Sequence, residues 1–271
     1  MKNIKLMIIA LVALLGFNSC SDKFNFNEEK KLVRYTCVND TNLVFIDRSF
    51  EYDAKGHLVS AYEEQNFAED VYSRGSYTYT WHKKGVDVHG EHAIKLLGDT
   101  EENNTTEDFT IKFENKRFAK FVYNNIEYKD YNYTYDSKGR LIHYRASVSD
   151  ITCEWEGDKL VSAVNIDIDG DLKYKYGNIS CVKGYCPIIV WNNTQEVITL
   201  AHPERVGLRT THCPVSVNYY SDFFDEPVSY CYVYEYEFDD EGYITKIKET
   251  QKDKNNNDEI MGVRIFTLTW E

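Results

Sequence analysis

Residues 133–144 read Y-T-Y-D-S-K-G-R-L-I-H-Y, and close variants recur at residues 50–62 (F-E-Y-D-A-K-G-H-L-V-S-A-Y) and 236–247 (Y-E-F-D-D-E-G-Y-I-T-K-I). Successive side chains of a strand point to opposite faces, so the alternating aromatic residues place their rings on one face. Asp136 can accept hydrogen bonds from the backbone two residues on, and Gly139 tolerates a positive φ, so D-x-x-G prescribes a tight turn. The phrase predicts a β-hairpin that is used as a repeated building block.

The same pattern extends over much of the chain, with turn centres near residues 55, 84, 115, 138, 157 and 241. Aromatic residues make up 15% of the sequence and only 4 prolines interrupt it, which favours strands. We expect one all-β domain over residues 32–271, an antiparallel β-meander whose hairpins form a curled sheet or an incomplete barrel. A two-sheet β-sandwich is the alternative, because both architectures fit hairpins at this spacing.

The pattern weakens between Tyr176 and Val228. A short helix capped by Thr194 and ended by Pro203 is predicted there. If the protein has a site, we expect it in this segment or on the face that the repeated rings leave open.

The N-terminus carries a targeting signal. Lys2 and Lys5 precede an apolar run over residues 6–17, which predicts a signal peptide over residues 1–19. The run is shorter than the roughly 20 residues that a membrane-spanning helix needs. The following N-S-C-S-D resembles a bacterial lipobox, although Phe17 stands where that pattern usually has an aliphatic residue. The resemblance implies lipidation of Cys20, with residues 20–31 as a flexible tether and ordinary secretion as the alternative.

The net charge of −13 restricts the partners. Such a balance argues against nucleic acid, and no run of basic residues indicates a phosphate patch or a hold on anionic lipid. The membrane, through Cys20, is the partner that the sequence predicts, together with a glycan or envelope protein as ligand.

Six further cysteines are Cys37, Cys153, Cys181, Cys186, Cys213 and Cys231. An exported compartment permits disulfides, but spacing does not choose among the pairings. Cys181 and Cys186 are near enough in sequence to staple a hairpin loop, and buried free cysteines are the other reading.

These observations support a family resemblance. The Y-x-Y-D-x-x-G-R-L hairpins look like the YD repeats of Rhs-type proteins. The order of lipobox, hairpins, a late L-P-x-x-I-type segment (here residues 213–217, C-P-V-S-V) and a final hairpin over residues 234–247 is similar to a Bacteroidetes lipoprotein family of unknown function. The resemblance implies a fold and an outer-membrane location, on the periplasmic face or at the cell surface. It implies no catalytic residue and no cofactor.

Two metal patterns are incomplete. Residues 165–171 (N-I-D-I-D-G-D) match the first half of a calcium loop, but Tyr176 stands where a bidentate Glu is needed, so a hairpin turn is the stronger reading. His89 and His92 point to opposite faces if they lie on a strand. The set Cys181, Cys186, His202, His212 and Cys213 lacks a zinc-finger spacing.

No catalytic motif is evident. The sequence contains no G-x-S-x-G elbow and no cysteine-protease signature, and the paired acids Asp239 and Asp240 fall in a predicted turn. Trp81, Trp155, Trp191 and Trp270 are candidates for an aromatic sugar-binding platform, although core packing explains strand aromatics first. We therefore expect a non-enzymatic envelope lipoprotein with a binding or scaffolding role. A glycan-binding accessory lipoprotein and a surface hydrolase of glycans or peptides are the alternatives.

Overall fold

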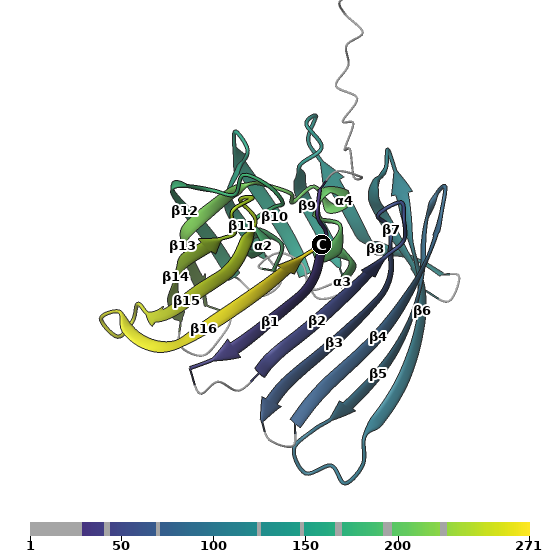
Figure 1. Ribbon diagram of the computed structural model, residues 1–271, viewed down its shortest axis with the longest axis horizontal. Helices are drawn as coiled ribbons and strands as arrows, with labels where there is room; N and C mark the ends of the chain where they lie inside the picture. Colours follow the sequence, from purple (N-terminus) through teal and green to yellow (C-terminus); the bar gives the residue numbers. More distant parts are fainter. Residues whose placement is uncertain are drawn as a thin grey trace, which may run out of the picture.

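The computed structural model describes residues 29–40, 44–68, 71–123, 126–146, 149–165, 170–191, 197–222 and 227–271. Within these ranges the chain forms an antiparallel meander of strands that closes into a barrel, with three short helices in one long connection (Figure 1). The strands are β1 (Leu32–Asn39), β2 (Val44–Tyr52), β3 (Leu58–Ala68), β4 (Val71–His82), β5 (Gly85–Lys95), β6 (Asn103–Glu114), β7 (Arg117–Tyr123), β8 (Ile126–Tyr135), β9 (Leu141–Ala146), β10 (Ser149–Glu156), β11 (Lys159–Asn165), β12 (Gly170–Ser180), β13 (His212–Ser221), β14 (Val228–Phe238), β15 (Ile244–Asp253) and β16 (Glu259–Trp270). The helices are α2 (Pro187–Trp191), α3 (Val197–Ala201) and α4 (Pro203–Val206).

The all-β antiparallel prediction is confirmed, but the curled sheet, the incomplete barrel and the two-sheet sandwich are wrong. The barrel is closed because β1 pairs with β2 on one side and with β16 on the other, so that Cys37 lies opposite both Ile46 and Phe266. An even number of antiparallel strands returns the chain to the end where it started. Lys31 and Glu271 exchange backbone hydrogen bonds there, at 2.5 and 2.9 Å. No local sequence pattern reports this pairing of the first strand with the last.

The predicted D-x-x-G turns are confirmed at all three copies. The Oδ1 atom of Asp136 accepts hydrogen bonds from the amides of Lys138 and Arg140, both at 2.9 Å, and Gly139 adopts a φ of 77°. Asp53 and Asp239 accept the equivalent bonds. Because hairpins alternate between the two ends of a meander, these turns and those near residues 84, 115 and 157 all lie at one end of the barrel.

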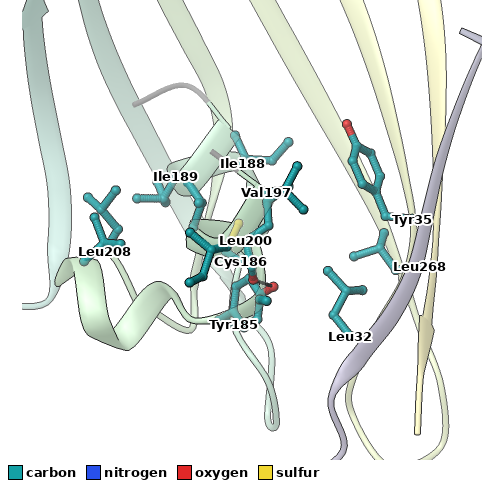
Figure 2. Packing of buried hydrophobic residues seen from close by; sticks show 14 of the residues in the cluster. Leu32, Tyr35, Tyr185, Cys186, Ile188, Ile189, Val197, Leu200, Leu208 and Leu268 are labelled. Atoms are coloured by element: carbon teal, nitrogen blue, oxygen red, sulfur yellow. Dashed lines mark hydrogen bonds between the residues drawn. The ribbon is translucent and has the colours of Figure 1, made fainter. Parts of the chain in front are cut away.

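The connection from β12 to β13 starts at that same end and folds into the barrel. We call the described residues of this connection, 181–191 and 197–211, the plug, this end the plug end and the opposite one the far end. Ile188, Ile189 and Leu200 are at most 1% exposed, and Figure 2 shows plug side chains facing Leu32 and Leu268 of the wall. The plug therefore fills the lumen at the plug end and completes the apolar core.

The helix predicted from Thr194 is present in part. α3 ends at Ala201, and Pro203 begins the next helix at its first turn, where a missing amide proton is tolerated. Thr194 lies outside the described residues. No helix in the described ranges is long and apolar enough to cross a membrane.

A set of inward aromatic side chains ties neighbouring strands together at the plug end, and we call it the collar. Each donates a hydrogen bond of 2.6–2.9 Å to a backbone carbonyl of the preceding strand, as Trp155 does to Leu141 and Trp270 does to Ile244. Most hairpins shift register at their plug-end turn, and a shift interrupts the ladder of backbone bonds. The members are Tyr52, Trp81, Tyr135, Trp155, Tyr176, Tyr236 and Trp270.

The outward face of the wall is polar and charged. On β15, Ile247 is buried toward the lumen while Lys246 and Lys248 point outward, where they pair with Glu237 and Glu235 of β14 at 2.8 and 2.6 Å. Other cross-strand pairs on this face are Arg34–Asp47, Lys112–Glu127 and His89–Asp108. Charged pairs at mid-strand are typical of a surface in contact with water.

Candidate functional site at the plug end

The segment in which we expected a site, between Tyr176 and Val228, contains the plug. The plug is held by hydrogen bonds to the turns around it. The Leu141 amide donates to the Gly207 carbonyl at 3.0 Å, the Val182 amide to the Gly242 carbonyl at 3.1 Å, and the Thr210 hydroxyl to the Asp158 carbonyl at 2.9 Å. Several of the repeated hairpins thus bind the same irregular segment of the chain, the plug.

His202 and Glu204 form a buried polar pair within the plug. The amide of Leu58 donates to His202 Nε2 at 3.2 Å, so the ring proton lies on Nδ1, which contacts Glu204 Oε1 at 3.1 Å. Burial is the largest single effect and raises the pKa of the Glu204 carboxyl, but His202, the Glu204 backbone amide and the Arg205 guanidinium together outweigh it and hold that pKa below its usual value. Because both imidazole nitrogens are engaged, the pair anchors the plug to β3 and has no free nitrogen with which to accept a substrate proton.

A pocket of about 500 Å³ opens beside the plug, between the turns near residues 55, 84 and 115. We call it the basic pocket, because every charged side chain that lines it is cationic or is a histidine. Arg205 of α4 forms one wall: its guanidinium donates to the Lys116 carbonyl at 2.7 Å and lies over the rings of Trp81 and Phe113. The lining residues are His57, Trp81, His82, Lys83, Lys84, Phe113, Asn115, Lys116 and Arg205.

Lysines also occupy the tips of the four successive plug-end turns on this side of the barrel. They are all exposed, and in the described ranges no carboxylate forms an ion pair with any of them. We call them the lysine rim: Lys55, Lys83, Lys84, Lys116 and Lys138. A protein with a net charge of −13 therefore carries a cluster of unneutralised positive charge at one end.

The tryptophans proposed as a sugar platform lie in the wall as structural residues. The indoles of Trp81, Trp155 and Trp270 belong to the collar, and the Trp81 ring also contacts His57, stacked at 4.9 Å, and the Arg205 guanidinium at 5.8 Å. The backbone of Trp191 ends α2, and its side chain lies outside the described residues. The core-packing interpretation is therefore confirmed for Trp81, Trp155 and Trp270.

The candidate histidine pair does not converge. His89 points outward to Asp108 and His92 points inward to Glu107, as the strand geometry predicted. Residues 166–169 of the calcium-like loop lie outside the described residues. The strands on either side pair as a hairpin, with Asn165 opposite Gly170, and Tyr176 belongs to the collar. Within the described ranges, no group of three acidic, histidine or cysteine side chains is arranged to hold a metal.

All six cysteines from Cys37 onward are buried free thiols in this structure, so the Cys181–Cys186 staple is not formed. Cys181 and Cys213 instead flank the plug, and both thiols contact the carbonyl oxygen of Thr211, at 3.4 and 3.6 Å. Burial raises the pKa of the Cys153 thiol to about 12, which keeps it protonated and unreactive. Cys20 lies outside the described residues.

Asp239 and Asp240 lie in the turn between β14 and β15, as predicted. The Asp239 carboxylate accepts hydrogen bonds from the amides of Glu241 and Tyr243, which gives it a role in the turn.

Sequence reasoning missed the lysine rim and Arg205. A signal for two of the lysines was present, because the D-A-K-G and D-S-K-G turns both carry lysine directly before glycine. Nothing local placed these two beside Lys83, Lys84 and Lys116, since the gathering of alternate turns at one end depends on the whole meander.

Comparison with known proteins gives a likeness of fold. No family model matches the chain, and no curated protein matches it. Among solved structures, a porin-like protein from Bacteroides uniformis ATCC 8492 is similar with a TM-score of 0.52 and 11% identity, over 89% of this chain and 98% of that one. A porin-like protein from Bacteroides vulgatus ATCC 8482 matches with a TM-score of 0.33 and 11% identity, over 89% and 99% of the two chains. The first of these similarities supports the barrel fold of this chain.

Proposed function

We propose that this protein is a non-enzymatic envelope lipoprotein, tethered to the outer membrane through a lipid on Cys20, whose barrel stands in water and binds its ligand at the plug end. The observation that carries the proposal is the polar outward face of the wall. A barrel that spans a membrane presents an apolar band about 25 Å tall to lipid, and each lysine or arginine at the bilayer midplane costs about 2–4 kcal/mol. Lys248 of β15 and His89 of β5, with their acidic partners Glu235 and Asp108, lie near the middle of their strands.

The lipid anchor then supplies the membrane attachment that the wall does not. The lipobox-like N-S-C-S-D motif follows an apolar run that is too short to span a bilayer. Several acyl chains on one cysteine hold a polar protein at a membrane far more firmly than a single chain does. The plug supports a role other than transport, because its buried residues fill the lumen at one end.

Detergent phase partition tests this proposal. The wild-type protein should incorporate radiolabelled palmitate and enter the detergent phase of Triton X-114, whereas Cys20→Ala should lose the label and move to the aqueous phase. A barrel embedded in lipid would remain in the detergent phase after the substitution. That result would refute the water-exposed barrel.

The basic pocket favours anionic ligands over neutral sugars. A sugar platform needs an aromatic face open to the ligand, and the Trp81 ring is already stacked on His57 and contacted by the Arg205 guanidinium. Lys83, Lys84 and Lys116 instead offer charged donors to a carboxylate, sulfate or phosphate. Binding of an acidic polysaccharide such as polygalacturonate, with neutral galactan as the control, checks the alternative of a glycan-binding lipoprotein.

A further inference from the structure

The topology places the tether and the lysine rim at the same end of the barrel. Glu29 and Lys30 precede β1, and the Lys30 amide donates to the Tyr243 hydroxyl at the plug end, at 3.0 Å. Arg209 of the plug forms an ion pair with Glu29. Glu29 lies nine positions after Cys20 in the sequence, and a fully extended chain of that length reaches about 30 Å. A lipid on Cys20 therefore keeps the plug end near the membrane surface.

The two ends of the barrel differ in charge. The lysine rim faces out from the turns between β2 and β9, next to the basic pocket. On the other side of the plug end the charges are paired, with Glu241 forming ion pairs with Lys30 and Lys183. Exposed acids lie near the far-end turns: Asp40, Asp99, Glu101 and Asp222. An anionic membrane surface attracts the lysine rim and repels the far end.

We propose that the lysine rim and the basic pocket dock onto the phosphates of anionic lipid headgroups, so that the plug end faces the membrane and the far end points away from it. This inference rests on the proposed lipid anchor, which brings the rim within reach of the headgroups. Lys83, Lys84, Lys116 and Arg205 all line the basic pocket, so a single phosphate inside it meets several cations. This proposal departs from the expectation, drawn from net charge, that the protein does not bind anionic lipid through basic residues.

Vesicle binding tests the docking separately from the lipid anchor. The mature chain, residues 20–271 with Cys20→Ser, should co-sediment with vesicles of phosphatidylcholine and phosphatidylglycerol at low salt, and not with pure phosphatidylcholine. Lys83→Glu/Lys84→Glu should weaken this binding about tenfold or more, since each lysine near an anionic surface contributes to the electrostatic attraction. The matched control is Lys173→Glu/Lys175→Glu, which makes the same charge change at exposed lysines on the outward face of β12.

Equal loss in both double variants would overturn the proposal, because it would show a non-specific effect of net charge. Binding of inorganic phosphate or polygalacturonate without binding to the anionic vesicles would also overturn it and assign the pocket to a soluble anion.

Orientation is tested on the lipidated protein in vesicles that carry an acceptor dye. A donor dye at Ser137, in a plug-end turn, should transfer energy to the membrane dye more efficiently than a donor dye at Leu97. Leu97 is 87% exposed and lies in a far-end turn. The difference should shrink in Lys83→Glu/Lys84→Glu and persist in the control variant. Equal transfer from both sites in a protein that incorporates palmitate would refute the docking while leaving the lipid anchor intact.

Discussion

The wall and the plug are built on opposite principles. The wall repeats antiparallel hairpins: three of them make the same turn bonds to an aspartate, and seven strands make the same collar bond to the preceding strand. The plug repeats nothing, yet its hydrogen bonds reach the turns near residues 55, 115, 138, 157 and 241. Short-range sequence patterns are therefore enough to form the hairpins of the wall. The wide lumen that these hairpins enclose is filled at one end by the irregular segment.

Leu200→Ala in the plug should produce the largest effect. Leu200 is 1% exposed, and truncation of a fully buried leucine removes apolar contacts and leaves a cavity, so the free energy of unfolding should fall by about 2–5 kcal/mol. Ile260→Ala, on the wall at 61% exposure, should change it by less than about 0.5 kcal/mol. Urea denaturation followed by tryptophan fluorescence measures both. Similar values for the two variants would mean that the plug is not part of the core.

Gly139→Ala tests where the wall depends on the plug. A positive φ costs a non-glycine residue about 1–2 kcal/mol, and the new methyl group would also displace Arg117, whose guanidinium donates to the Glu204 carbonyl of the plug. The total loss should be about 2–3 kcal/mol, since one hydrogen bond contributes about 1 kcal/mol.

Gly157→Ala is the matched control for this turn. Gly157 also has a positive φ, of 60°, but nothing lies within 4 Å of the added methyl group. The free energy of unfolding of this variant should fall only by the cost of a positive φ, about 1–2 kcal/mol. Equal losses in the two variants would show that the turn and the plug are uncoupled.

Tyr176→Phe removes one collar bond and keeps the ring. The Leu160 carbonyl then loses the hydroxyl that donates to it at 2.8 Å, inside the barrel, so stability should fall by about 1–2 kcal/mol. Tyr72→Phe removes an exposed hydroxyl on the outward face and should be nearly neutral. Thermal denaturation of the two variants decides whether the collar contributes to stability.

Acidification should destabilise the plug through Glu204, with the smallest effect of the four. The folded pKa of this carboxyl is lower than its unfolded value of 4.5, so the unfolded state binds the proton first. Its contribution is complete above about pH 4.5 and is lost as the pH falls through the folded pKa. Glu204→Gln should flatten this part of the stability–pH curve. Glu237→Gln, an exposed acid on the wall, should leave the curve unchanged, and an identical slope in the two variants would contradict the role of Glu204.

Several features were predictable because their causes are local. The D-x-x-G turns follow from one aspartate and one glycine, and the inward aromatic face follows from alternation along a strand. His89 and His92 were correctly assigned to opposite faces for the same reason. The plug was recognised only as the place where the pattern fails, since its short helices are stabilised by burial and not by their own propensity.

The sequence by itself determined the hairpin unit, the antiparallel class and the expected N-terminal signal, because each depends on residues a few positions apart. The tertiary structure alone shows that β16 meets β1, that residues 181–191 and 197–211 enter the lumen, and that Lys83, Lys84 and Lys116 line a pocket with Arg205. These features join residues far apart in the chain, and their free energy comes from burial and ring closure. The same repeated turns that make the wall therefore also gather the charge of the plug end.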